Sequence, residues 1–146
     1  MKTVISFPAG KTWEYIEEYH VHTHAVKKGY PTLKKIPQYI AFRKKGGIIE
    51  HIFEVVKMIE INPLDLEAAK EHLTDDEYGR LCAYDKARAN MGYKHAPQYK
   101  YRFYFLEPSE IEGIQLPIEL GCNPQSHTYH YLNQFIKRNL ADDANK

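Results

Sequence analysis

The segment from Gln38 to Ile61 constrains the fold more than any other part of the sequence. Residues 38–43 read QYIAFR and residues 48–61 read IIEHIFEVVKMIEI, so both stretches are rich in the β-branched and aromatic residues that favour strands. Between them lies Lys44-Lys45-Gly46-Gly47, in which adjacent glycines supply the positive φ angles of a tight hairpin turn. The pattern predicts a β-hairpin with a long second strand.

That second strand carries apolar residues on both faces. Strict alternation places Ile49, His51 and Phe53 on one face and Ile48, Glu50 and Ile52 on the other. Apolar residues on two faces are typical of a strand that bends through a small barrel. We therefore expect an α+β fold whose sheet is a small, curved, mainly antiparallel β-barrel flanked by helices.

The remaining elements are predicted from turn residues and periodicity. Residues 2–7 read as a strand, residues 12–19 as a helix that Thr12 caps, and residues 64–89 as two helices, the second beginning near Thr74. Residues 99–107 alternate as a strand, and a short strand is expected within 114–120. A last helix is expected after Ser126, with its inner face formed by Tyr129, Leu132, Phe135 and Ile136.

Length and composition indicate one ordinary globular domain, spanning residues 1–146, of which 43% is hydrophobic and 27% charged. No apolar run approaches the roughly 20 residues that cross a bilayer, and the first residues do not read as a secretory signal. Cys82 and Cys122 form no motif, which favours a reducing compartment, so we expect a cytoplasmic protein without a membrane partner.

A net charge of +1 conceals two oppositely charged segments. Residues 19–49 contain seven Lys or Arg, three His and no acid, whereas residues 60–77 contain seven acids and one lysine. A basic loop interleaved with aromatic rings suits a phosphate backbone and stacked bases, although charge runs are often merely solvated. The acidic helical region 64–77 offers a surface for a basic protein partner.

Histidines suggest the main catalytic alternative. A strand would place His20, His22 and His24 on one face, and a helix would place His20 and His24 together. Either geometry could offer two nitrogen ligands to Zn²⁺ or Fe²⁺. The segment contains no H-E-x-x-H or C-x-x-C motif, so we expect no bound metal and no cofactor. Cys122, with His127 and His130 downstream, is a weak candidate nucleophile, and no phosphate-binding glycine motif is present.

Several predicted strands, and the expected entry to the C-terminal helix at residues 128–132, resemble a known superfamily. Residues 39–43, the Gly-Gly turn, residues 49–57, residues 101–106 and residues 128–132 are similar to the PUA-like superfamily, particularly its EVE and ASCH branches. The similarity covers about residues 35–135 and implies a small β-barrel flanked by helices, with a pocket that accepts nucleic acid or a modified base in an aromatic cage. Related modules accompany prokaryotic defence and restriction proteins.

The leading hypothesis is therefore a non-catalytic binding module whose ligand is a nucleic acid (DNA or RNA) or a modified nucleobase. A prokaryotic defence system is the setting that the resemblance implies. The candidate ring walls are Trp13, Tyr39, Phe42, Tyr101 and Phe103. The candidate phosphate contacts are Lys34, Lys35, Arg43, Lys44, Lys45 and Arg102. The alternatives are a metal-assisted nuclease or hydrolase that uses His20, His22, His24 and His51, and an accessory subunit that binds another protein.

Overall fold

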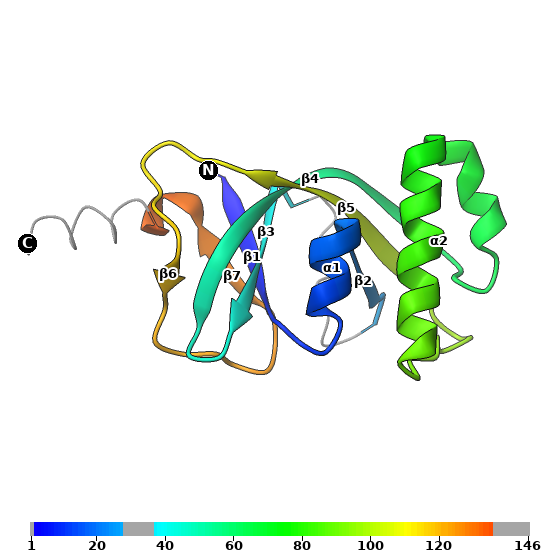
Figure 1. Cartoon of the computed structure of the whole chain (residues 1–146), viewed down its shortest axis with the longest axis horizontal. Helices are drawn as coiled ribbons and strands as arrows, with labels where there is room; N and C mark the ends of the chain where they lie inside the picture. Colours follow the sequence, from blue (N-terminus) through cyan, green and yellow to red (C-terminus); the bar gives the residue numbers. More distant parts are fainter. Residues whose placement is uncertain (1, 28–36, 136–146) are drawn as a thin grey trace, which may run out of the picture. The chain divides into compact units, whose positions relative to one another are not determined.

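The computed structural model describes residues 2–27 and 37–135, and the chain forms two compact units (Figure 1). Unit 1 consists of Met1–Ala9, Leu33–Val55 and Glu107–Lys146, and unit 2 of Gly10–Thr32 and Val56–Leu106. The predicted phosphate contacts Lys34 and Lys35 lie outside the described residues.

Unit 1 is built on a mixed sheet. Its strands are β1 (Thr3–Pro8), β3 (Tyr39–Lys44), the first part of β4 (Ile48–Ile61), β6 (Ile118–Glu119) and β7 (Thr128–Tyr131). The order is β4-β3-β1-β7, and β6 pairs with β4. β1 runs parallel to β3, whereas the β1–β7, β3–β4 and β4–β6 pairs are antiparallel. The predicted hairpin and the α+β class are confirmed, and the sheet is curled and mainly antiparallel.

A β-bulge in β4 corrects the predicted division of its faces. Ala41 pairs with Ile52, and Arg43 pairs with Ile49. An advance of two residues along β3 therefore corresponds to three residues along β4. Because the extra residue reverses the alternation, Ile49 and Ile52 belong to one core cluster instead of opposite faces. Phe53 lies outside that cluster and packs edge-on against Phe42, with 5.9 Å between ring centroids.

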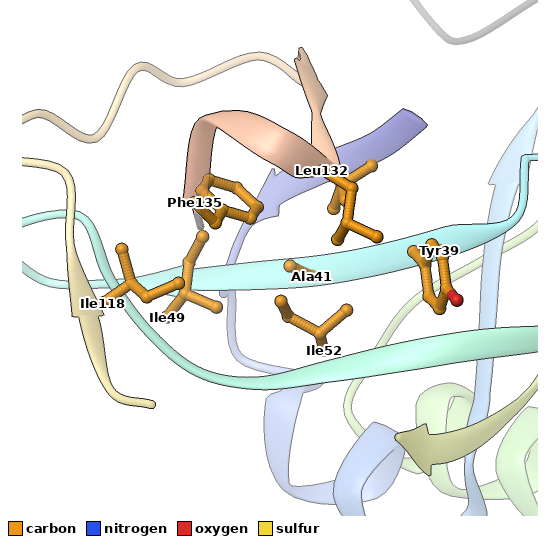
Figure 2. Packing of buried hydrophobic residues seen from close by; sticks show 8 residues of the cluster. Tyr39, Ala41, Ile49, Ile52, Ile118, Leu132 and Phe135 are labelled. Carbon is orange, nitrogen blue, oxygen red and sulfur yellow. The ribbon is translucent and has the colours of Figure 1, made fainter. Parts of the chain in front are cut away.

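The core of unit 1 joins residues from both ends of the chain (Figure 2). Ile49 and Ile52 of β4 and Ala41 of β3 pack against Leu132 and Phe135, from the helical turn after β7. The other buried members of the cluster are Val4, Tyr39 and Ile118. β7 ends directly before Leu132. Tight packing of Leu132 and Phe135 in this core therefore holds β7 against β1.

The hairpin turn requires its glycines for two different reasons. Gly46 and Gly47 have φ angles of 82° and 76°, which L side chains rarely adopt. Gly47 is also buried against a second loop, since a Cβ atom built on it would lie 2.2 Å from the carbonyl oxygen of Cys122. The Leu120 amide donates to the Gly47 carbonyl at 3.1 Å. The turn therefore supports the loop that leads to β7.

Unit 2 combines helices with an antiparallel strand pair. It contains α1 (Trp13–Tyr19), β2 (Val21–Ala25), the 3₁₀ helix η1 (Leu66–His72), α2 (Asp75–Asn90) and most of β5 (Tyr101–Ser109). β2 pairs with β5 from Val21 opposite Phe105 to Ala25 opposite Tyr101. Thr12 occupies the N-cap position of α1 without a side-chain capping bond, so the predicted cap is wrong: its backbone has helical rather than extended dihedral angles.

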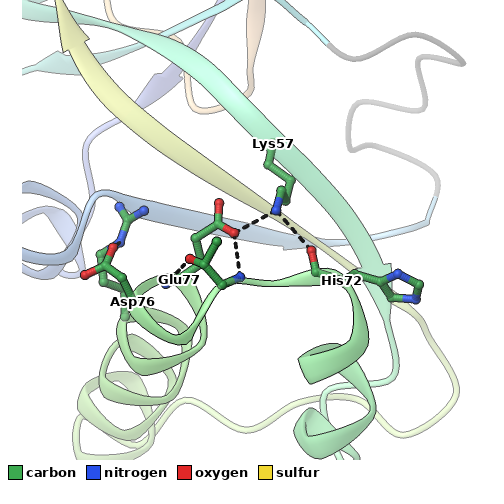
Figure 3. Close-up of polar contacts among 6 residues, drawn as sticks. Lys57, His72, Asp76 and Glu77 are labelled. Atoms are coloured by element: carbon green, nitrogen blue, oxygen red, sulfur yellow. Dashed lines mark hydrogen bonds and ion pairs between the residues drawn. The ribbon is translucent and has the colours of Figure 1, made fainter.

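The start of α2 follows the sequence prediction closely (Figure 3). The Glu77 amide donates to Thr74 Oγ1 at 3.1 Å, and the Thr74 amide donates to Glu77 Oε1 at 2.9 Å, which completes a capping box. Lys57 Nζ of β4 donates to the same Glu77 oxygen at 2.7 Å. The cap thus also ties α2 to the strand.

The predicted C-terminal helix is wrong at its beginning. Thr128–Tyr131 form strand β7, and helical residues start at Leu132. Tyr129 is exposed on the strand instead of buried on a helix, whereas Leu132 and Phe135 are buried as expected. Ile136 lies outside the described residues. Across the described part of the chain, no helix is long and apolar enough to cross a membrane.

Candidate functional site

The edge strand β7 presents a row of aromatic rings. Tyr129 and Tyr131 are 47% and 50% exposed. Being two residues apart on a strand, they share a face, and their backbones pair with Ile5 and Thr3 of β1. The His127 ring packs edge-on against Tyr129, with 5.2 Å between centroids. We call His127, Tyr129 and Tyr131 the tyrosine edge.

A buried arginine lies behind this edge. Arg43, at the end of β3, is 1% exposed, and its guanidinium makes five hydrogen bonds to uncharged acceptors. Nε donates to Ser6 Oγ at 2.8 Å and Nη2 to the Ser6 carbonyl at 3.3 Å. The remaining acceptors, Asn123 Oδ1 at 3.1 Å and the carbonyls of Pro124 at 3.0 Å and Ser126 at 2.5 Å, lie in the loop before β7. These bonds satisfy the donors without neutralising the charge.

That charge acts on two histidines beside β7. Burial, and then the positive charge of Arg43, lower the pKa values of both His127 and His130. His130 Nε2 lies 2.7 Å from Ser6 Oγ, the same hydroxyl that accepts from Arg43. Both imidazoles are therefore neutral at neutral pH, and Arg43 supplies the positive charge.

The hairpin turn adds basic side chains at the same end of unit 1. Lys45 is exposed, and the Lys44 side chain, 33% exposed, forms an ion pair of 2.9 Å with Glu50. Asn123 Nδ2 donates to the Lys44 carbonyl at 3.3 Å, which joins this turn to the loop before β7. Lys44 and Lys45, predicted as phosphate contacts, thus lie at a turn that is bonded to the loop before β7.

The other predicted site residues are mostly buried. Phe42 and Phe103 are 2% and 0% exposed, and Tyr39 and Tyr101 are also buried. Trp13 is half-buried at the start of α1. Arg102 is buried, and its Nε donates to Glu60 Oε1 at 2.7 Å. Tyr39 and Phe42 belong to unit 1, whereas Trp13, Tyr101 and Phe103 belong to unit 2.

The histidine run does not place three imidazoles on one strand face. His20 follows α1 with a left-handed φ of 55°, and only the next residue begins β2. His24 Nε2 lies 2.8 Å from the Tyr104 hydroxyl and Nδ1 2.9 Å from the Ala25 carbonyl, so both nitrogens have protein partners. Burial lowers the pKa of His22 well below its usual range. Within residues 2–27 and 37–135, no group of three or more His, Cys, Asp or Glu side chains is arranged to hold a metal ion.

A pocket of about 550 Å³ lies elsewhere in unit 1. Its floor includes Ile52, and its remaining lining comes from residues 109–112 and 114–116, with Glu110 and Glu112 among them. Acidic side chains repel phosphates, so this pocket does not suit a nucleic-acid backbone.

Comparison with solved structures identifies the architecture. A crystal structure of ASCH from Zymomonas mobilis aligns with a TM-score of 0.50 and 13% identity over 95% of this chain and 94% of that chain. The chain has an ASCH-like fold. A serine-to-alanine mutant of the Zymomonas protein aligns with a TM-score of 0.50 and 12% identity over the same shares, 95% and 94%. No family model matches the sequence, and no curated protein matches it significantly.

The ASCH-like fold that the sequence predicted is confirmed, but sequence reasoning missed the tyrosine edge. Tyr129 was assigned to a helix, and Ser6 was not singled out. The signal that could have found the strand is the run Thr128-Tyr129-His130-Tyr131, in which residues of high β-propensity stand together after a turn.

Proposed function

We propose that this chain is a binding module for single-stranded nucleic acid, with the bases stacking on the tyrosine edge. The observation that carries the proposal is the pair of exposed rings, Tyr129 and Tyr131, on one face of an edge strand. Large aromatic rings are usually covered, and Tyr suits stacking because its ring is flat and its hydroxyl tolerates water.

The spacing of the rings fits unstacked nucleotides. Alternate residues of a strand lie about 7 Å apart, so each ring has room for its own base. Base–aromatic stacking contributes about 1–3 kcal/mol per base and accepts any base, because every base has a π face. Bases within a duplex are already stacked on one another, which favours single strands for this surface.

Positive charge accompanies the rings. Lys45 is exposed and Lys44 partly so at the turn joined to the loop before β7. The Arg43 donors are occupied within the protein, so Arg43 contributes through its field rather than through contacts with phosphates. Glu50, which forms the ion pair with Lys44, neutralises part of this positive charge. We therefore expect moderate rather than tight binding of nucleic acid.

The proposal keeps part of the original set of candidate residues. Lys44 and Lys45 remain the phosphate contacts, while the bases are assigned to Tyr129 and Tyr131, because Phe42 and Phe103 have almost no exposed surface. The PUA-like resemblance supports nucleic acid or a modified base as the ligand class. Recognition of a modified base is a finer proposal that the same assay addresses with modified probes. A place in prokaryotic defence is a separate proposal, which rests on the resemblance alone.

The test is fluorescence anisotropy with labelled single-stranded RNA, single-stranded DNA, duplexes and base-modified strands at several salt concentrations. Tyr129→Ala and Tyr131→Ala should each weaken binding by about 1–3 kcal/mol and leave the salt dependence nearly unchanged, because stacking releases few ions. Tyr129→Phe should keep most of the affinity, since it keeps the ring. Lys44→Glu with Lys45→Glu should instead flatten the salt dependence.

Tyr93→Ala is the matched control, because Tyr93 is 42% exposed but belongs to unit 2. It should bind like the unmodified protein. Loss of affinity in this variant equal to that of Tyr129→Ala would show that exposed tyrosines act nonspecifically. Absence of binding to every probe at low salt would refute nucleic acid as the ligand and favour a protein partner for the acidic region 64–77.

A further inference from the structure

We infer that Ser6 and His130 are positioning residues that fasten β7 to β1 only while His130 is neutral. The tyrosine edge would then be ordered at neutral pH and released in acid. The consequence for nucleic-acid binding rests on the proposed function, whereas the fastening itself stands on the hydrogen bonds of unit 1.

The direction of these hydrogen bonds follows from what each group can do. Arg43 Nε always donates, so Ser6 Oγ accepts from it at 2.8 Å. The single hydroxyl hydrogen of Ser6 is then available for His130 Nε2, 2.7 Å away. Ser6 Oγ has a second lone pair, but among the described residues His130 Nε2 is the only acceptor that the structure gives the Ser6 hydroxyl hydrogen. We therefore assign the lone pair to Nε2 and the proton to Nδ1, which is a neutral imidazole.

Protonation of His130 removes that acceptor. Ser6 Oγ would then face two donors, Arg43 Nε and His130 Nε2, and its own hydrogen would lose its partner. Ser6 is 0% exposed, so water does not readily replace the lost bond. A second positive charge would also appear beside Arg43, whose five hydrogen-bond partners are all uncharged.

Within residues 2–27 and 37–135, burial and Arg43 are the causes of the lowered pKa of His130, and no negative charge is among them. Ser6 from β1 and the Phe135 ring, 5.3 Å from the imidazole centroid, are uncharged. Arg43 from β3 is positive, and His127 on the approach to β7 also lies within its field. Burial and then Arg43 lower the pKa of His130, in agreement with this geometry.

The sign of the pH dependence follows. An unfolded His130 takes up a proton near pH 6.5, whereas the folded protein takes it up only at lower pH. The contribution of the neutral form to stability is therefore complete above about pH 6.5 and is lost as the pH falls toward the lowered pKa. β7 is also held by four backbone pairs with β1 and by the packing of Leu132 and Phe135, so loss of this bond should loosen the strand without unfolding unit 1.

Hydrogen exchange of the β7 amides, expressed as protection factors, tests the fastening directly at pH 7.5 and pH 5. The unmodified protein should lose protection at pH 5 relative to pH 7.5, because His130 takes up its proton below its usual range. His130→Gln should show little loss, because its side-chain oxygen accepts from Ser6 without titrating. Ser6→Ala should be poorly protected at both pH values, and His51→Gln, which changes an exposed histidine of β4, should behave like the unmodified protein.

Nucleic-acid binding at the same two pH values separates the two proposals. Simple gain of positive charge tightens binding in acid, whereas release of β7 weakens it, and His130→Gln should remove that weakening. Protection that changes with pH without any nucleic-acid binding would refute the proposed function and leave this inference intact. Protection that stays constant, or that falls equally in His130→Gln, would overturn the inference whatever the protein binds.

Discussion

Replacing Gly47 with alanine is expected to destabilise unit 1 far more than the same change at Gly46. Both glycines have positive φ angles, 76° and 82°, which cost an L residue about 1–2 kcal/mol. A Cβ atom on Gly46 meets nothing within 4 Å, whereas one on Gly47 would lie 2.2 Å from the Cys122 carbonyl oxygen and 2.9 Å from its carbonyl carbon. The Gly46→Ala variant therefore measures backbone strain alone.

In Gly47→Ala the backbone of Cys122 has to move away. This movement strains the hydrogen bond from the Leu120 amide to the Gly47 carbonyl and that from Asn123 Nδ2 to the Lys44 carbonyl, each contributing about 0.5–1.5 kcal/mol. With the strain at φ, the expected loss is about 2–5 kcal/mol, against about 1–2 kcal/mol for Gly46→Ala. Urea denaturation followed by circular dichroism measures both. Equal losses in the two variants would show that the Cys122 loop does not rest on the turn.

Further outcomes concern the core of unit 1 and the start of α2. Phe135→Ala should cost about 3–5 kcal/mol in urea denaturation, because Phe135 is 2% exposed in the core of unit 1, whereas Tyr131→Ala should cost about 0.5 kcal/mol or less. Burial raises the pKa of Glu77, but its bonds to Lys57 and Thr74 outweigh burial and lower it overall, so stability should fall as the pH drops from about 4.5 through the folded value. Glu77→Gln should reduce that acid dependence, and an unchanged pH profile would contradict the role of this carboxylate.

The sequence predicts the fold where local signals and long-range packing agree. The Gly46-Gly47 hairpin has both β-propensity and turn chemistry, and the start of α2 has a complete capping box at Thr74 and Glu77. The bulge in β4 is not visible in the sequence, because it arises from pairing with β3 and leaves no glycine or proline at the extra residue. Strict alternation therefore assigned Ile52 to the wrong face.

The candidate site was harder to predict because its residues come from distant segments. Ser6, Arg43 and His130 meet only through the pairing of β1 with β3 and β7. In the sequence, Arg43 reads as one of several basic residues beside a turn, and nothing local distinguishes a buried arginine from an exposed one. The Tyr129 segment also satisfies a helical period through Leu132 and Phe135, and the pairing with β1 decides in favour of a strand.

The position of β1 between β3 and β7 bears on the order in which the chain folds. β1 spans Thr3–Pro8, yet its antiparallel partner contains residues 128–131. Closing so long a loop is entropically costly and slows folding, so the sheet of unit 1 is completed only after most of the chain is made. The segments of unit 2 end at Leu106, so all the residues of unit 2 are synthesised before β7. Until residues 128–131 are made, one edge of β1 is unpaired, and an unpaired strand edge can pair with other chains.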